Sequence, residues 1–79
     1  MEDIGVRFGR AVRERRKRLG LSQEEFAGKC DLDRSYMGGV ERGQRNISLV
    51  NINKIARGLC ISLSELFRGV SSHDAKARR

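Results

Sequence analysis

Residues 22–45 hold the pattern that most constrains how this chain can fold: two short amphipathic segments separated by a tight turn. Ser22 is typical of a residue that caps the start of a helix, and Glu25 stands three positions later, where it can complete a capping box. Spacings of three and four between apolar residues predict two helices that share one core. Those apolar residues are Phe26, Cys30, Leu32, Met37 and Val40.

Two further residues suit the turn and the crossing of these helices. Asp31 stands at the turn, where Asp tolerates the left-handed backbone better than most residues. Ala27 is small, as a close approach of two helices requires. The pattern therefore predicts a helix-turn-helix. Because the formal net charge of the chain is +7, the expected partner of this motif is DNA.

The length and composition allow one small domain in a chain of 79 residues. Such a domain buries only about 60% of its unfolded surface, so a second copy would add stability. The basic charge favours nucleic acid or an acidic membrane surface, but the basic helix lacks the bulky apolar face that would insert into a membrane. Because no apolar run approaches about 18 residues and MEDIGVRFGR lacks the apolar core of a signal peptide, we expect a cytoplasmic, nucleoid-associated protein.

Apolar periodicity along residues 1–68 predicts an all-α domain of five helices. The expected helices cover residues 4–19, 23–30 and 34–42, then run from a cap at Ser48 to Leu59 and from a capping box at Ser62 and Glu65 through Phe67. Gly20 and Gly43 end the first and third helices. The apolar stripes comprise Phe8, Val12 and Leu19 in the first helix, and Leu49, Ile52, Ile55, Ala56 and Leu59 in the fourth. Residues 69–79 are polar and aperiodic, which predicts a disordered basic tail, and its Lys76, Arg78 and Arg79 could contact phosphates.

The motif resembles that of the bacterial and phage repressors typified by the lambda repressor, the XRE family. The resemblance covers roughly residues 6–68 and rests on LSQEEFA (21–27), SY (35–36), VERG (40–43), ISL (47–49) and LSELF (63–67). Residues 31–36, 39–42 and 45–46 are also similar to the controller proteins of restriction–modification systems. The resemblance implies a compact lambda-repressor-like domain that binds a pseudo-palindromic operator as a homodimer. A controller would regulate its own promoter and that of a linked restriction gene.

The base-reading residues are expected at the start of the second motif helix, which enters the major groove in helix-turn-helix proteins. After Asp33 as the cap, these are Arg34, Ser35 and Tyr36. Arg34 is the strongest candidate, because a guanidinium can donate two hydrogen bonds to guanine O6 and N7, although a phosphate contact is the alternative. Tyr36 could instead pack its ring on the domain and offer its hydroxyl to a phosphate. The resemblance to controllers adds Arg45 as a residue that reaches bases.

Phosphate contacts are expected on both sides of this helix. Gln23, with Ser22 beside it, begins the first motif helix, and the resemblance implies that the Gln23 side chain binds a phosphate. The alternative for Gln23 is an ordinary surface position. Phosphate-binding residues are also expected in the loop after the second motif helix, at Arg42, Gln44 and Asn46. The run RERRKR at residues 13–18 either attracts DNA at long range or forms a solvated helix face.

Gly38 and Gly39 depart from the family pattern, in which a Ser usually precedes a larger residue. Each glycine inside a helix costs about 1 kcal/mol relative to Ala, and Gly39 falls where relatives often read a base. Either the helix must approach the DNA closely, or Arg34 and Arg42 need room to move. The sequence leaves both explanations open.

Two further pairings follow from the resemblance. Arg16 falls on the apolar stripe of the first helix, where its charge requires a carboxylate, and the resemblance implies Glu41 as the partner. A single short helix reads few base pairs, so two copies about 34 Å apart are expected on the DNA. The resemblance places the dimer contact around the last two helices, at Ile61, Leu63, Leu66 and Phe67.

Other activities find little support in the sequence. Cys30, Cys60 and the single His73 match neither a zinc site nor a redox CxxC, so we expect two buried thiols, with a disulfide as the alternative, and no cofactor. No pair of catalytic groups stands out, so no enzyme is expected. An antitoxin-type module that also binds a toxin is the alternative function, although little chain follows the last helix for wrapping a partner. Activation of transcription would also require a contact with RNA polymerase, for which Glu24 and Glu25 are candidates.

Overall fold

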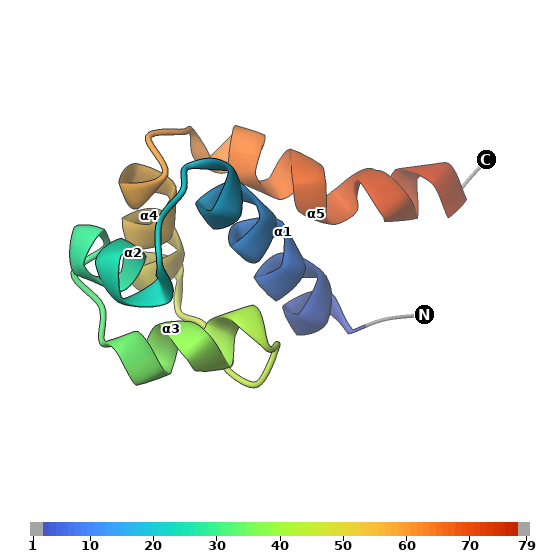
Figure 1. Ribbon diagram of the computed structural model, residues 1–79. Coiled ribbons are helices and arrows are strands. Elements are labelled where there is room, and N and C mark those ends of the chain that lie inside the picture. Colours follow the sequence, from blue (N-terminus) through green and yellow to red (C-terminus); the bar gives the residue numbers. More distant parts are fainter. Residues whose placement is uncertain (1–2, 78–79) are drawn as a thin grey trace.

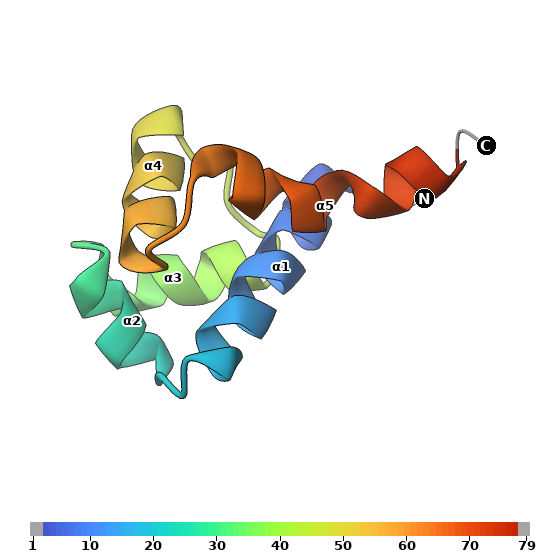
Figure 2. The same cartoon turned by 90° about the horizontal axis from the view of Figure 1, so that it is seen from above.

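The computed structural model describes residues 3–77, with side chains through Val70. It contains α1 (Ile4–Arg18), α2 (Gln23–Lys29), α3 (Arg34–Glu41), α4 (Leu49–Gly58) and α5 (Leu63–Ala77), and no strand within this described part. The predicted all-α fold of five helices is therefore confirmed. α1 packs against both α3 and α5, and α3 lies along one edge of the domain (Figure 1). Figure 2 shows α2, α3 and α4 grouped at one end, with α5 extending away.

The predicted caps fix the starts of α2 and α4. The Ser22 hydroxyl accepts a hydrogen bond from the backbone N–H of Glu25 (3.0 Å), and the Ser22 N–H donates to the Glu25 carboxylate (2.9 Å). These contacts hold the pKa of Glu25 below its usual value. Ser48 caps α4 through the backbone N–H of Asn51 (3.1 Å). At α5 the Ser62 hydroxyl accepts from the N–H of Glu65 (3.1 Å), while the Glu65 carboxylate contacts Arg15 of α1 (3.3 Å).

The ends of the helices follow from single left-handed residues. Asp31 has a φ of 57°, as predicted, and Gly20 and Gly43 have φ values of 73° and 75°. A fourth such residue, Cys60, follows α4 with a φ of 60°. The first three helices each end one residue before the predicted limit, because Leu19, Cys30 and Arg42 serve as C-caps.

The core gathers one apolar face from each helix. Its buried members are Phe8, Ala11, Val12, Phe26, Ala27, Cys30, Met37, Val40, Ile55, Ala56, Leu59, Leu66 and Val70. Two of the predicted stripe positions are wrong, because Leu19 is 51% exposed and Leu49 is 73% exposed. Leu19 lies outside α1 at its C-cap, and Leu49 is the first residue of α4, so neither lies over the core.

The last helix is longer than predicted. Its backbone includes residues 69–77, for which the sequence predicted a disordered tail. Val70 supplies the physical reason, because it follows Leu66 by one helical turn and both side chains are buried. The predicted phosphate contacts of Lys76, Arg78 and Arg79 fall outside the residues whose side chains are described.

The two cysteines have different surroundings. Both thiols are free, but only Cys30 is buried, so the prediction of two buried thiols is wrong for Cys60. Cys60 is exposed at the left-handed turn after α4. Cys30 lies against Gly58, and burial raises the pKa of its thiol from 9.0 to about 11.

Candidate nucleic-acid interface

The N-terminus of α3 is an exposed and firmly capped helix end. One carboxylate oxygen of Asp33 accepts hydrogen bonds from the backbone N–H groups of Ser35 (3.0 Å) and Tyr36 (3.4 Å), and also from the Ser35 hydroxyl. The hydrogen bonds from Ser35 and Tyr36 lower the pKa of Asp33. Arg34 and Ser35 are exposed. Because the Ser35 hydroxyl hydrogen is engaged by Asp33, Arg34 is the freer donor at this end.

Tyr36 connects α3 to two other parts of the chain. Its side chain is half-buried, and its hydroxyl accepts a hydrogen bond from Asn51 Nδ2 of α4 over 3.0 Å. The guanidinium carbon of Arg45 lies 5.4 Å from the centre of the Tyr36 ring, which is within the range of a cation–π contact. Sequence reasoning missed Asn51, because an Asn on the polar side of a helix carries no local signal of its partner.

The two glycines of α3 make room for side chains. A Cβ atom on Gly38 would lie 3.1 Å from Nη1 of Arg42 and 3.4 Å from Oε1 of Gln23. A Cβ atom on Gly39 would lie 3.0 Å from both Cγ and Nε of Arg45. The structure thus supports the explanation based on space for arginines, but the second arginine is Arg45 rather than Arg34.

A buried polar cluster connects α1, α2 and α3. Arg16 and Glu41 are both 8% exposed, and Arg16 Nε lies 2.7 Å from Glu41 Oε2. Gln23 Nε2 donates to Glu41 Oε1 over 3.0 Å. The Gln23 amide nitrogen carries two hydrogens, so a second hydrogen bond can be donated from it. Ser22, next to Gln23, is exposed and caps α2.

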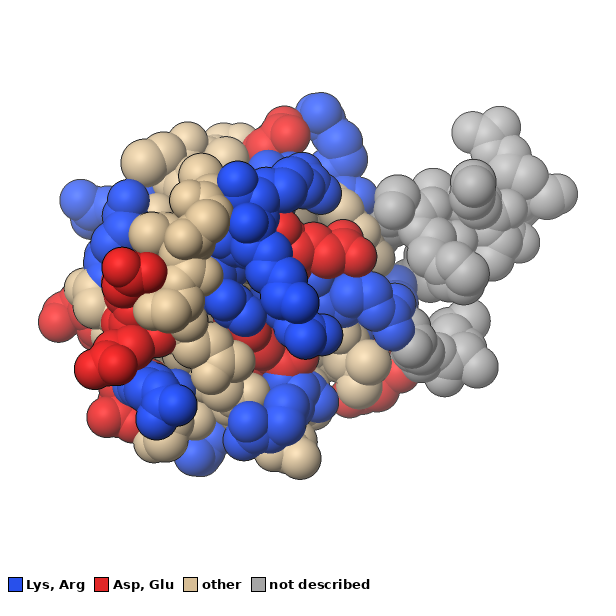
Figure 3. Space-filling model, in the orientation of Figure 1, with Lys and Arg blue, Asp and Glu red and all other residues tan. Residues whose placement is uncertain are grey.

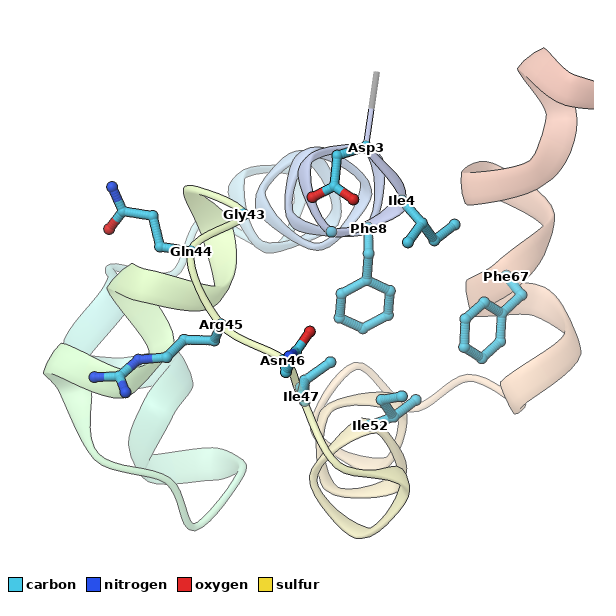
Figure 4. A pocket seen from close by; sticks show the side chains of 11 residues that line it. Asp3, Ile4, Phe8, Gly43, Gln44, Arg45, Asn46, Ile47, Ile52 and Phe67 are labelled. Carbon is cyan, nitrogen blue, oxygen red and sulfur yellow. The ribbon is translucent and has the colours of Figure 1, made fainter. Parts of the chain in front are cut away.

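The loop after α3 is anchored at its start. The N–H of Gln44 donates to the carbonyl of Gly39 (2.9 Å), and Nε of the exposed Arg42 donates to the side chain of Gln44 (3.0 Å). In Figure 4, the Gln44 side chain points away from the domain interior, while Arg45 is directed toward α3. Asn46 is exposed in the same loop.

Charge is distributed unevenly around these elements. On the face seen in Figure 3, Lys and Arg side chains cover the centre, where α1 lies, and recur along the lower edge, where α3 lies. Asp and Glu side chains gather at the side of α2. Within residues 3–77, no cluster of three or more His, Cys, Asp or Glu residues could hold a metal ion. In the same described part, no helix is both long and apolar enough to cross a bilayer.

The predicted dimer residues occupy different environments. Leu66 is fully buried in the core, so its assignment to a dimer contact is corrected. Ile61 is half-buried against the core, and the Phe67 ring lies 5.8 Å from that of Phe8 between centroids. Leu63 is 38% exposed and remains available at the surface.

More apolar surface is exposed elsewhere. Leu49 and Val50, in the first turn of α4, are 73% and 67% exposed, and Ile4 is 55% exposed. A pocket of about 400 Å³ lies between the start of α1, the loop after α3, and α4 and α5. Figure 4 shows its apolar side chains, which belong to Ile4, Phe8, Ile47, Ile52 and Phe67.

The sequence of this chain is similar to that of known helix-turn-helix proteins. The helix-turn-helix family model matches residues 12–66. The control protein C.MunI from a Mycoplasma species is 52% identical over 71 residues, which are 89% of this chain and 96% of that protein. This chain belongs to the helix-turn-helix controller proteins. Its predicted resemblance is thereby confirmed.

Two further relatives fit the same family of controllers. The control protein C.BamHI from Bacillus amyloliquefaciens is 43% identical over 65 residues, which are 81% of this chain and 80% of that protein. The crystal structure of the restriction–modification controller protein C.AhdI from Aeromonas hydrophila is similar with a TM-score of 0.77 and 60% identity. The match covers 80% of this chain and 96% of that structure. The helix-turn-helix of this controller is therefore formed by α2 and α3.

Proposed function

We propose that this controller protein is a sequence-specific transcriptional regulator that binds a pseudo-palindromic operator as a homodimer. The observation that carries the proposal is the exposed, capped N-terminus of α3, which presents Arg34 at the surface. α3 is anchored to the domain by the buried Arg16–Glu41 ion pair. A rigid helix with a free guanidinium at its exposed end suits recognition of a guanine in the major groove.

The contacts divide into those that read bases and those that position the protein on the backbone. Arg34 and Arg45 are the base-reading groups in this proposal, and the half-buried Tyr36 supports Arg45. Ser35 takes a smaller part, because its hydroxyl already donates to Asp33. The phosphate-binding groups flank α3 on both sides and comprise Ser22, Gln23, Arg42, Gln44 and Asn46.

A second copy completes the reading surface. The exposed residues Leu49 and Val50 lie in the chain between Ile47 and Ile52, which both line the pocket, so protruding apolar side chains and an apolar hollow occur close together. A twofold interface requires such self-complementarity, because each surface patch meets its own copy. We assign the dimer contact to this face of α4, together with Leu63 at the start of α5.

Regulation would then depend on the concentration of the protein itself. Dimerisation and DNA binding are coupled, because the dimer binds two half-sites at once. We propose that the operator controls the gene of this protein and a linked restriction gene. The protein would then act in the cytoplasm, bound to the nucleoid. Activation would use the acidic side of α2, where Glu24 and Glu25 are exposed, to contact RNA polymerase. An antitoxin role is not proposed, since the relatives named above are controllers.

Selection of duplexes from a random-sequence DNA pool tests this function, because the selection itself finds the operator. Wild type should enrich a pseudo-palindrome, and Arg34→Ala should lose roughly five- to tenfold of its preference at one base pair in each half-site. Arg18→Ala is the control, because it removes the same charge from an exposed site at the far end of α1. Equal enrichment of all sequences by wild type, with affinity that falls steeply with salt, would leave only non-specific binding and overturn the proposal.

A further inference from the structure

The side chain of Arg45 lies against Gly39 and over the ring of Tyr36, whose hydroxyl accepts a hydrogen bond from Asn51. We infer that these three residues form a seat that holds the Arg45 guanidinium on the surface of α3 before DNA is bound. In this arrangement, Gly39 determines specificity by leaving space, and Asn51 acts as a positioning residue through Tyr36. The inference rests on the proposed function and extends it, because it explains how a loop residue becomes a defined base reader.

Gly39 provides the space for this seat. A side chain at position 39 would start 3.0 Å from Cγ and Nε of Arg45 and 3.5 Å from its Cδ. Gly39 does not have a positive φ, so the backbone conformation does not require glycine there. Since glycine in a helix costs about 1 kcal/mol relative to Ala, the space taken by Arg45 is the physical reason for Gly39.

Tyr36 and Asn51 provide the other side of the seat. Tyr36 and Gly39 are three residues apart, so they are neighbours on one face of α3. The guanidinium carbon of Arg45 lies 5.4 Å from the centre of the Tyr36 ring, where the cation is attracted to the ring face. Asn51 holds the outer end of that ring through its 3.0 Å hydrogen bond to the hydroxyl. α4 thereby helps to fix the position of a side chain that comes from the loop.

The backbone of the loop also returns Arg45 to α3. Gly43 turns the chain with a φ of 75°, and the N–H of Gln44 donates to the carbonyl of Gly39. The next residue is Arg45, whose side chain points from the loop back toward α3 in Figure 4. The exposed guanidinium of this loop residue therefore covers the surface of α3, the helix that begins with Arg34. It occupies the space that a larger side chain at position 39 would take in a relative.

The decisive variant is Gly39→Ala, with Gly28→Ala as its control. Both changes add a methyl group inside a helix, but a Cβ atom on Gly28 meets nothing within 4 Å. Both variants should keep the helical circular-dichroism spectrum of wild type. Their melting temperatures should equal or exceed that of wild type. In selection from the random duplex pool, only Gly39→Ala should lose roughly five- to tenfold of its preference at the base pair read by Arg45. Full preference in Gly39→Ala would overturn the seat.

A double-mutant comparison separates the seat from the proposed function. Arg45→Ala should weaken the preference at the same base pair. Gly39→Ala should cause no further loss of this preference when it is added to Arg45→Ala. If Arg45→Ala relaxes the preference but Gly39→Ala adds a separate loss, the seat is wrong and the base-reading role of Arg45 stands. If Arg45→Ala leaves the preference unchanged, Arg45 is not a base reader, and both the seat's purpose and that part of the proposed function fail.

Nuclear magnetic resonance of the free protein tests the seat without DNA. The Cδ protons of Arg45 should be shifted upfield by the ring current of Tyr36, and Tyr36→Leu should remove the shift. Asn51→Ala and Gly39→Ala should reduce it, whereas Gly28→Ala should not. Random-coil shifts for Arg45 in the folded wild type would overturn the inference, whatever the binding data show.

Discussion

Arg16 of α1 and Glu41 of α3 meet at two points in the interior of the domain. Nε of Arg16 lies 2.7 Å from Oε2 of Glu41, and Nη2 lies 3.0 Å from Oε1. The remaining nitrogen, Nη1, donates to the carbonyl of Leu21 over 2.8 Å. The pair therefore joins α1, the turn before α2 and the end of α3, and it fixes the orientation of the helix that we propose reads DNA.

Removal of one partner of this pair should destabilise the whole domain. Glu41→Ala leaves the Arg16 charge buried without a counter-ion, so we expect the free energy of unfolding to fall by about 3–5 kcal/mol. Arg15→Ala breaks the more exposed Arg15–Glu65 pair and should cost less than about 1 kcal/mol. Urea denaturation followed by circular dichroism measures both. Equal, small losses would show that the buried pair does not anchor α3.

The crossing of α1 and α3 should tolerate no side chain at Gly9. A Cβ atom there would lie 2.3 Å from the carbonyl oxygen of Val40 and 2.6 Å from that of Glu41. Gly9→Ala should therefore force the helices apart and lower the free energy of unfolding by roughly 2 kcal/mol or more. Gly28→Ala should instead raise it by up to about 1 kcal/mol. Thermal and urea denaturation would contradict this packing if both variants changed stability with the same sign.

A single charge on the proposed dimer face should weaken dimerisation, because the dimer would bury it. Val50→Glu places a carboxylate on the exposed apolar face of α4, and we expect at least a tenfold weaker dimer in sedimentation equilibrium, roughly 1.4 kcal/mol or more. Leu19→Glu is the control, because Leu19 is also exposed but lies at the C-terminal end of α1. A weaker dimer for Leu19→Glu with an unchanged one for Val50→Glu would move the interface to the other end of the domain.

The two thiols should differ in reactivity and in their dependence on pH. At about pH 8 an aromatic disulfide reagent should modify Cys60 rapidly, while Cys30 should react only when the fold opens. Burial raises the pKa of Cys30 to about 11, so the fold favours the protonated thiol. This contribution to stability is fully present below the ordinary pKa of 9.0 and is lost as the pH rises through the folded value.

The Cys60→Ser variant isolates Cys30 for this test. Its remaining thiol should react in native buffer much more slowly than in urea, because only the small open fraction of molecules exposes it. In contrast, Cys30→Ser should retain the fast phase. A fast phase in Cys60→Ser would mean that Cys30 is accessible, and would contradict the packing of this thiol under Gly58.

The features that the sequence predicted correctly depend on neighbours in the chain. Ser22 and Ser48 cap helices through residues three positions later, and Asp31 needs only its own tolerance of a positive φ. The apolar spacing of Phe26 and Met37 likewise gives their burial, because a helix turns every 3.6 residues whatever surrounds it. The Arg16–Glu41 pair is a contact across the fold that the sequence still predicts, because a charge on an apolar stripe requires a carboxylate and the family resemblance implies Glu41.

Most contacts between residues that are distant in the sequence could not be predicted from local spacing. Leu49 continues an apolar spacing but lies on the surface, and Val70 extends the core beyond the expected end of the last helix. Leu66 is apolar, as a residue of a dimer interface would be, yet its side chain is fully buried in the core of the domain. In each case the spacing identifies an apolar face, whereas the packing of other helices decides where that face is covered.

The sequence by itself determined the helices, their caps and the presence of a basic helix-turn-helix, since these depend on interactions over one or two helical turns. Only the tertiary structure decided that Gly9 lies under Val40, that Asn51 supports Tyr36 and that Arg45 occupies the space beside Gly39. A glycine or an asparagine has the same local propensity wherever it stands. Its purpose appears only when a residue from another element is brought against it.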